Sequence, residues 1–273
     1  MSEKNEPSLG VIVGSAFQLE LLDGVPVELV SIDTSWGIWE MFRIDAAGRS
    51  TYVSFRHGHP HRLLPHQIPY RAQAAAFREV HCGALLTTSS VGVLDTDLPL
   101  YKPLIVTDLI TLENRLPDGS ACTMFPKPTE NHGHLVLSEG LFSRALSRQL
   151  AGFLGHAKYP ERRVVFGYVG GPRTKTIAEN AMWSRLGAHV NSMTVAPEVI
   201  LANELEIPCC CAVVGHKYSI PGIENPEDER SVAQSLTDSR AGLTQLVRSF
   251  LLEAAPVPFG NHLYRYTDID RRS

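Results

Sequence analysis

The segment 56–61 reads RHGHPH and directly follows a short apolar run that we predict to be a strand. Arg56 offers a forked cation and His57 a second hydrogen-bond donor, and this pair suits a phosphate dianion. The alternating histidines could instead point to one side of a strand and bind a metal ion. Because Pro60 interrupts strand geometry and no carboxylate stands nearby in the sequence, we favour phosphate over metal, with a purely structural cluster as the third interpretation.

A second candidate contact to an anion is the Gly-Ser-Ala turn at 14–16, which follows another apolar run. Backbone N–H groups can approach an anion closely at such a turn, and the Ser15 hydroxyl adds a donor. Most Gly-Ser turns only redirect the chain, so this one indicates an anion site only if other hydrogen-bond donors lie near it. Ser89 is such a donor, because it follows the predicted buried strand 84–88 and precedes a glycine that permits close backbone approach.

The elements that must position these side chains are clearest between residues 164 and 219. This stretch repeats the order strand, tight turn, helix. That order is typical of an α/β protein with parallel strands, whose ligands bind at the carboxyl ends of the strands. Those ends are expected near 170–174, 192–196 and 215–218.

Apolar runs and helical periodicity predict the remaining elements. Strands are expected at 9–13, 27–32, 38–44, 51–55, 84–88, 104–112 and 163–169. Helices are expected at 67–82 and 143–154, and a long helix should begin at the N-cap pair Asn225-Pro226. The segment 113–136 is too long for a simple connection, and long loops in compact domains often form pockets.

Composition narrows the class of function. The chain has 273 residues, of which 44% are hydrophobic and 20% are charged, so it can bury a large core. A net charge of −4 gives no electrostatic reason to bind nucleic acid or an anionic membrane. There are five cysteines, an odd number, and no signal peptide or long apolar span is recognisable, so we expect a reduced, cytoplasmic protein. Cys209–Cys211 are expected to be small buried strand residues rather than redox or metal ligands.

Two further segments carry a resemblance. GGPRTKTIAE at 170–179 and NSMTVAPEVILANELEIP at 191–208 resemble, in order and spacing, the GPRxxTxAE and MTxxPEVxLAxExG segments of the trimeric purine nucleoside phosphorylase and methylthioadenosine phosphorylase family. The resemblance covers most of 9–252. It implies an α/β fold with one nucleoside phosphorylase domain, 9–254, in which helices flank a mixed central sheet. Residues 1–8 would be a disordered N-terminus and 255–273 a C-terminal tail.

The same resemblance implies a role for each candidate residue. Phosphate would be bound by Ser15, Arg56, His57, Ser89 and Thr194. The ribose and its 5′ group would meet His61, Met193 and, from a neighbouring subunit, His134. The base would be bound by Ser90, Thr174, Lys175, His216 and Tyr218. Without the family frame, Met193 and Thr194 could equally be a strand end and a helix cap, and a lone histidine is more often structural than catalytic.

The base-facing residues depart from the family's pattern. His216 stands where members carry the Asn or Asp that binds or protonates purine N7, so we expect it to be the catalytic donor and the rate to follow an ionisation near the imidazole range. Lys175 stands where 6-oxopurine-specific members have a Glu, and Tyr218 replaces the second Asp of the adenine-specific type. Both asparagines of the family's Asn-Tyr-x-Ala-Asn helix start are lost, at Pro69 and Gln73.

The reaction that the resemblance implies is phosphorolysis of a purine nucleoside to the free base and ribose 1-phosphate. RHGHPH is closest to methylthio-nucleoside enzymes, which favours 5′-methylthioadenosine or 5′-methylthioinosine as the substrate. Inorganic phosphate would be the co-substrate, with no metal or other cofactor, and the assembly a homotrimer or a hexamer of two trimers. A diverged member that binds a nucleoside or base without turnover is the first alternative, and a metal-dependent amidohydrolase is the second.

Overall fold

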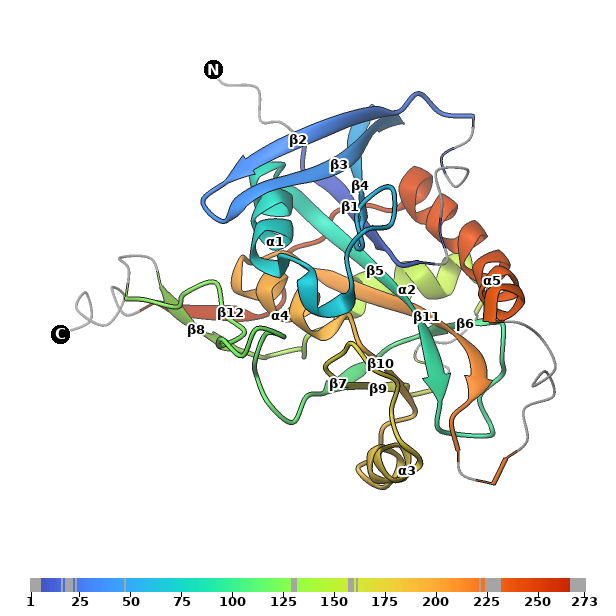
Figure 1. The fold of residues 1–273 in the computed structure, drawn as a ribbon. Coiled ribbons are helices and arrows are strands. Elements are labelled where there is room, and N and C mark those ends of the chain that lie inside the picture. The colour runs from blue at the N-terminus through green and yellow to red at the C-terminus, as the bar shows by residue number, and fades with distance from the viewer. Residues whose placement is uncertain are drawn as a thin grey trace, which may run out of the picture.

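The computed structural model describes residues 6–15, 17, 22, 24–46, 48–128, 132–156, 160, 162–220, 222–223 and 232–265. In this part of the chain ten strands form one mixed sheet, and two more form a separate ribbon. Figure 1 shows the sheet running through the centre of the molecule with helices packed around it. The α/β fold with a mixed central sheet, which the sequence predicted, is confirmed.

The sheet is organised around β5 (Cys82–Val93). On one edge β5 pairs in parallel with β11, and on the other with β1, beyond which β4, β3 and β2 follow in order. The remaining strands of the sheet, in chain order, are β1 Ser8–Val13, β2 Glu28–Thr34, β3 Gly37–Ala46, β4 Arg49–Phe55, β6 Pro103–Ile105, β7 Asp108–Ile110, β9 Val165–Tyr168, β10 Val190–Ser192 and β11 Cys209–Tyr218.

A change of neighbour along β5 creates the place where a site can form. β1 pairs with β5 only up to Thr87, whereas β10 pairs antiparallel with Gly92 and Val93. Since β11 occupies the opposite edge over the same residues, β10 must use the edge that β1 has left. Strands β1 and β10 therefore end facing each other across Ser89 and Ser90, and β9 follows β10 in parallel.

Helices cover both faces of the sheet and bury two separate apolar clusters. Helices α1 (Tyr70–Glu79) and α4 (Ala196–Glu204) pack on one face, where Phe77 and Val199 are fully buried. Helices α2 (Arg144–Phe153) and α5 (Val232–Glu253) pack on the other, where Leu146 and Phe250 are fully buried. A shorter helix, α3 (Ile177–Arg185), covers the ends of β9 and β10 through Trp183.

Local sequence explains where two of these helices begin. Thr176 caps α3, because its hydroxyl accepts from Glu179 N while the Glu179 carboxylate accepts from Thr176 N. Ser143 caps α2 by accepting from Leu146 N. The expected helix start at Asn225-Pro226 lies outside the described residues.

The C-terminal segment is docked rather than free. Residues 254–257 pass along the sheet, where Val257 N donates to Gly83 O and Ala254 is buried. The chain then forms β12 (His262–Arg265), which pairs antiparallel with β8 (Gly133–Val136). Figure 1 shows this β8–β12 ribbon projecting from the side of the molecule, away from α5. The segment that followed the expected domain end at 254 is thus part of the packed structure as far as Arg265.

Several predicted boundaries need correction. The helix expected at 67–82 is only α1, because Pro65–Gln67 forms a separate short 3-10 turn and Cys82 already begins β5. The strand expected at 104–112 is divided into β6 and β7, which pair with different neighbours, β11 and β9. Ser8, expected in a disordered N-terminus, is the buried first residue of β1, and its hydroxyl donates to Val80 O.

The cysteine run 209–211 is buried in a strand, as predicted. All five are free thiols, and Cys209–Cys211 are the first residues of β11 with no more than 1% exposure. Burial raises the pKa of Cys82 to about 12. Such thiols stay protonated at neutral pH and act as small apolar residues. In the described part of the chain, none of the helices has the length and apolarity needed to cross a bilayer.

Candidate active site

Arg56 forms a buried ion pair with Glu198 in the first turn of α4. Arg56 Nε donates to Glu198 Oε1 at 2.5 Å and Nη2 donates to Oε2 at 2.8 Å, so the guanidinium and the carboxylate form a bidentate pair. Thr87 Oγ1 accepts from Nη2 and donates to Oε2, and Thr88 O accepts from Nη2 as well. Burial alone would lower the pKa of Arg56, but Glu198 outweighs it and raises that pKa, so the cation is permanent.

The third guanidinium nitrogen remains available. Arg56 Nη1 makes no hydrogen bond within the described residues, and it faces the turn that follows β1. A Cβ on Gly14 would come within 2.9 Å of Nη1, so glycine at this position keeps the nitrogen open. Ser15 follows with an exposed side chain. The structure therefore places Gly14 of this turn next to Arg56, and the role of Ser15 as a phosphate contact stays a prediction.

Three hydroxyl groups meet at the middle of β5, next to this cation. Ser89 Oγ lies 3.1 Å from Thr194 Oγ1 and 3.3 Å from Ser192 Oγ. Ser192 Oγ donates to Ser90 O at 3.1 Å, which fixes the position of the cluster on the strand. Ser89 and Thr194 were both predicted as phosphate contacts, and the structure brings them together.

An unusual backbone turn orients Thr194. Ala196 N donates to Thr194 O at 3.0 Å, and Val195 between them has φ 76° and ψ −57°, the values of a γ-turn. A β-branched residue at positive φ is strained, and strain of this kind gathers at functional sites. The turn directs Thr194 to Ser89 while the start of α4 brings Glu198 to Arg56.

His57 and His61 form a stacked pair beside the cation. Their ring centroids are 4.5 Å apart with an interplanar angle of 10°. His57 Nδ1 donates to Leu63 O at 2.8 Å, which leaves its Nε2 as the free nitrogen. Burial, reinforced by Arg56, lowers the pKa of His57 to about 4, so the ring is neutral at pH 7. A phosphate that still carries a proton could donate that proton's hydrogen bond to Nε2.

The third histidine of the motif points elsewhere. His59 packs against Phe42 and Phe55, with ring centroids 5.6 and 5.2 Å away, at the edge of a cavity of about 390 Å³ lined mainly by β3 and the segment 58–69. The three imidazoles therefore do not converge. Among the residues that the structure describes, no group of three or more histidine, cysteine or carboxylate side chains is arranged to hold a metal ion.

Met193 lies where three loops meet. A Cβ on Gly171, after β9, would approach Met193 Sδ to 3.0 Å, and it would approach the Cβ of Pro65 to 3.3 Å. The loop from β4, which carries His57 and His61, thus contacts the carboxyl ends of β9 and β10. The predicted contact of Met193 with a ribose stays a prediction.

His216 occupies an irregular position in β11. The pairing with β5 shifts between Gly215 and Lys217, so His216 is the extra residue of a β-bulge. Tyr101 Oη donates to His216 O at 3.0 Å, and His216 Nδ1 is buried with no partner among the described residues. Burial, then Lys217 and Lys175, lowers the pKa of His216 to about 4. The sequence suggested a pKa near the usual imidazole value, and the structure lowers it. His216 is therefore neutral at pH 7.

The other predicted base contacts divide into two groups. The ammonium group of Lys175 contributes to the lowered pKa of His216, and burial followed by Lys217 lowers the pKa of Lys175 itself to about 8. Ser90 is present at the hydroxyl cluster through its carbonyl. Thr174, by contrast, is exposed and accepts from Arg173 through its own carbonyl. The Tyr218 hydroxyl donates to Leu98 O at 3.0 Å.

His134 is not part of the cluster around Arg56. It lies on β8 in the projecting ribbon, paired with Tyr264 of β12, and its side chain is exposed. Within one chain it joins none of the contacts described above. Its predicted role in a neighbouring subunit's site stays a prediction.

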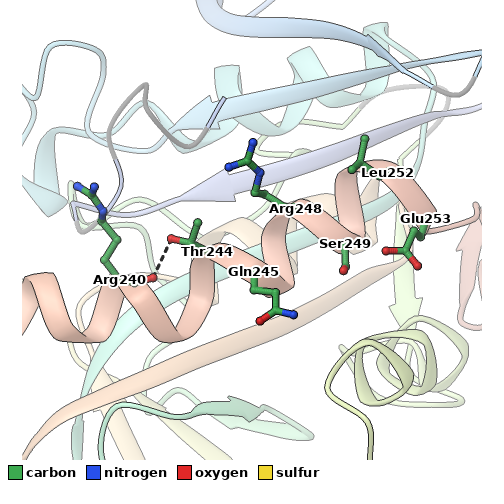
Figure 2. Close-up of a pocket in the computed structure, with 7 residues that line it drawn as sticks. All are labelled: Arg240, Thr244, Gln245, Arg248, Ser249, Leu252 and Glu253. Atoms are coloured by element: carbon green, nitrogen blue, oxygen red, sulfur yellow. Dashed lines mark hydrogen bonds between the residues drawn. The ribbon is translucent and has the colours of Figure 1, made fainter. Parts of the chain in front are cut away.

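A separate groove of about 580 Å³ runs along the outer side of α5 (Figure 2). Its lining comes from this one helix: Arg240, Thr244, Gln245, Arg248, Ser249, Leu252 and Glu253. Thr244 Oγ1 donates to Arg240 O within the helix. Side chains on a single helix face do not converge on a bound molecule as loops from several strands do, so we place the candidate site at the strand ends instead.

Sequence reasoning missed three residues of this site as functional candidates. Glu198 was visible in the motif PEV but received no role, although an acidic residue in an otherwise apolar helix start signals a buried cation. Thr87 lies in an apolar strand and gave no signal. Ser192 directly precedes Met193 and Thr194, and its place at the expected strand end was the available clue.

Comparisons with known proteins show the family to which the chain belongs. A family model described as "Phosphorylase superfamily" matches residues 8–252. A probable S-methyl-5′-thioinosine phosphorylase of Pseudomonas syringae pv. tomato is 32% identical over 61% of this chain and 66% of its own length. A purine nucleoside phosphorylase of Streptomyces coelicolor is 34% identical over 76% of this chain and 74% of its own length.

Solved structures share the fold. A methylthioadenosine phosphorylase from an antarctic soil metagenomic library superposes with a TM-score of 0.76, over 90% of this chain and 85% of that one, at 21% identity. The match of the family model to nearly the whole sheet and its helices, together with the relatives' identity, establishes kinship. The chain belongs to the phosphorylase superfamily.

Proposed function

We propose that the protein is a nucleoside phosphorylase that cleaves the N-glycosidic bond of a purine nucleoside with inorganic phosphate. The observation that carries the proposal is Arg56, a permanent buried cation whose open Nη1 faces the Gly14 turn. Ser15, Ser89 and Thr194 supply hydroxyl donors around it. One fixed cation with several neutral donors at converging strand ends suits a phosphate oxyanion.

In the proposed reaction the C1′–N9 bond breaks and its electron pair leaves with the base, while a phosphate oxygen forms the new bond to C1′. The transition state has oxocarbenium character, as in glycoside cleavage generally. The anion bound at Arg56 stabilises the positive ribose and is already in place for the attack. His61 and Met193, at the meeting point of the three loops, are the residues that would hold the ribose.

At the other end, the leaving base needs stabilisation of the charge it receives. His216 is neutral, so it would act as a hydrogen-bond donor to purine N7 and not as an imidazolium acid. Its position in a bulge directs the ring out of the regular strand alternation. The base would take its proton from solvent after it has left.

We further propose a substrate whose 5′ position carries a methylthio group, as in 5′-methylthioadenosine or 5′-methylthioinosine. The motif RHGHPH supports this, as do relatives named S-methyl-5′-thioinosine phosphorylase and S-methyl-5′-thioadenosine phosphorylase. A methylthio group lacks a hydroxyl, so it needs apolar surroundings and no hydrogen-bond partner.

Release of free base should depend on inorganic phosphate. The test is to incubate purified protein with 5′-methylthioinosine and 5′-methylthioadenosine, with and without phosphate, and to measure base and sugar phosphate by chromatography. Arg56→Ala should reduce kcat/KM by about 10²-fold or more, because it removes a charge-assisted contact in a dry site. Equal base release without phosphate would show a hydrolase, and binding without any release would favour the diverged, non-catalytic member.

We also propose that three copies assemble and that the β8–β12 ribbon of one covers the site of the next. The ribbon presents exposed apolar side chains beside His134, namely Val136, Leu137 and Tyr264, at 43, 49 and 42% exposure. Apolar side chains gathered on a projecting ribbon suit a surface that another subunit covers. A closed ring of three has this kind of heterologous contact.

Light scattering at micromolar concentration should therefore give the mass of a trimer, or of a hexamer made of two trimers. His134→Ala should lower kcat/KM for the 5′-methylthio nucleoside without dissociating the trimer. Mixing Arg56→Ala with His134→Ala subunits should restore part of the activity. Some sites then combine an intact Arg56 from one subunit with an intact His134 from its neighbour. A fully active monomer would exclude this assembly.

A further inference from the structure

The connection between β5 and β6, residues 94–102, crosses β11 near its carboxyl end. Residues 212–214 of β11 pair with both strands, so β5 and β6 lie on opposite edges of β11 and the chain must pass across it. The last registered pair of β6 with β11 joins Pro103 to Val214. The bulge that contains His216 begins directly beyond this pair.

Tyr101, in this connection, binds the bulge through two hydrogen bonds. Tyr101 N donates to Gly215 O at 2.8 Å, and Tyr101 Oη donates to His216 O at 3.0 Å. The registered pairs of β6 stop at Val214, so Tyr101 supplies donors to the next two carbonyls of β11. One residue therefore binds the backbone at the place where the register of β11 shifts.

The backbone of Tyr101 is held in a strained conformation to do this. Its φ of 59° lies in the left-handed region, which residues with a large side chain rarely adopt. Strain of this kind persists only where the surrounding contacts over-determine the conformation. In this conformation the main-chain N–H and the hydroxyl of one residue reach two successive carbonyls.

A second tyrosine ties the same connection to β11 in the opposite direction. Tyr218 Oη donates to Leu98 O at 3.0 Å, and Ser219 N donates to Val93 O at 2.7 Å. Tyr101 thus binds from the connection to the strand, while Tyr218 binds from the strand to the connection. The bulge is held on both sides of His216.

Close packing of β5 and β11 keeps the bulge in its register. A Cβ on Gly215 would come within 2.2 Å of Val93 Cγ2, and a Cβ on Gly92 would come within 2.4 Å of Ser219 Oγ. The two strands therefore approach so closely beside His216 that these positions have room for glycine alone. A slip of the bulge by one residue would bring a side chain into this space.

We propose that Tyr101 is a positioning residue for the departing base, because it fixes the bulge that directs the His216 ring. The inference rests on the proposed phosphorolysis, in which His216 donates to purine N7, and it adds the residue that keeps this donor in place. His216 Nδ1 is buried and has no partner in the described part of the chain. The direction of the ring therefore depends on the backbone that Tyr101 binds.

The physical reason is preorganisation. A hydrogen-bond donor lowers the barrier most when it already points at the atom on which charge develops. Without Tyr101 Oη the His216 carbonyl loses its donor, and the bulge can adopt more than one arrangement. The loss should appear in kcat and not in the KM for phosphate, because the proposed phosphate contacts lie on other strands.

Steady-state kinetics with the nucleoside that wild type cleaves fastest are the first test. Tyr101→Phe should lower kcat by roughly tenfold, the effect of one hydrogen bond, and leave the KM for phosphate unchanged. Tyr52→Phe, at a half-buried tyrosine of β4 that takes no part in these contacts, is the matched control and should keep the wild-type kcat. A Tyr101→Phe variant with wild-type kcat would overturn the inference.

A double-mutant cycle separates positioning from a general effect on the fold. In a His216→Ala background, Tyr101→Phe should have no further effect on kcat, because Tyr101 acts through His216. If the two losses instead multiply, or if Tyr101→Phe raises the KM for phosphate, Tyr101 supports the fold and not the base donor, and the inference is wrong.

NMR spectra of protein labelled with nitrogen-15 histidine give a readout that needs no turnover. The ring signal of His216, assigned by its absence in His216→Asn, should be sharp in wild type and broadened or doubled in Tyr101→Phe. His189 Nδ1 accepts from Val165 N at 3.0 Å, away from the bulge, so its signal should be the same in both. An unchanged His216 signal in Tyr101→Phe would contradict the proposed positioning.

Failure of the proposed function looks different from each of these results. Wild type would then release no base from any nucleoside in the presence of phosphate. The histidine spectra would still show whether Tyr101 holds the His216 ring.

Discussion

Glu198→Ala should lower the free energy of unfolding by about 3–5 kcal/mol, the range found when one partner of a buried ion pair is removed. The variant leaves the Arg56 guanidinium 1% exposed without its carboxylate, and it also removes the acceptor of Thr87 Oγ1. Denaturant unfolding followed by circular dichroism measures the change. The same variant should lose phosphate-dependent activity, because Arg56 is no longer held with Nη1 towards the Gly14 turn.

A surface pair provides the matched control. Arg163 Nη2 donates to Asp108 Oδ2 at 2.5 Å, but the two side chains are 66 and 48% exposed. Arg163→Ala should therefore cost only about 0–1 kcal/mol. The double variant Arg56→Met/Glu198→Met should recover part of the stability lost in Glu198→Ala, since no unpaired charge is then buried, yet it should stay inactive. Equal losses in Glu198→Ala and Arg163→Ala would show that the buried pair is not what holds this region together.

His216→Ala should reduce kcat by about 10²–10³-fold, the effect of removing one preorganised donor from a site where charge develops. His216→Asn should retain most of the rate, because an amide can donate to the same atom. The pH profile separates donor from acid: with a pKa near 4, His216 gives no inflection at the usual imidazole range, so wild type and His216→Asn should show the same pH dependence between about pH 5 and 7. Steady-state kinetics over that range are the measurement.

The double variant sharpens this test. In His216→Asn/Lys175→Glu the amide can donate to one edge of a 6-oxopurine, and the carboxylate can accept the hydrogen bond of its N1 proton at the other edge. The rate with hypoxanthine nucleosides should therefore be higher than in His216→Asn alone. A clear rate loss through pH 6.5 in wild type, absent in His216→Asn, would instead show that binding of the nucleoside restores an ordinary imidazole pKa. Should His216→Ala leave the rate unchanged on every substrate, His216 is structural.

Much of the site was accessible from the sequence because its residues are fixed by strand ends. Apolar runs of limited length locate strands, and polar or small residues that directly follow them must lie at the edge of the sheet. Arg56, Ser15 and Met193 were predicted in this way, with the family motif, and the structure places Arg56 beside the Gly14 turn and Met193 between converging loops. The repeat from β9 to β11 was likewise readable, since each strand, turn and helix uses only neighbouring residues.

Other features depend on distances that no local pattern encodes. The exchange of β1 for β10 along one edge of β5 requires strands about a hundred residues apart to meet, and it decides that Ser89 contacts Thr194. The division of 104–112 into β6 and β7 has the same origin, because the two halves pair with different strands. A sequence contains the hydrophobicity of a strand but not its partner.

The sequence by itself determined the residue types at the candidate site, the α/β class and the burial of the cysteine run, because these follow from local apolarity and motif spacing. Tertiary structure alone decided the charge states. Glu198 offsets the burial that would lower the pKa of Arg56, and burial beside Lys175 and Lys217 makes His216 a neutral donor where the sequence suggested an ordinary imidazole. The physical reason is that a pKa depends on solvent exclusion and on charges brought together by folding, and neither exists until the strands have met.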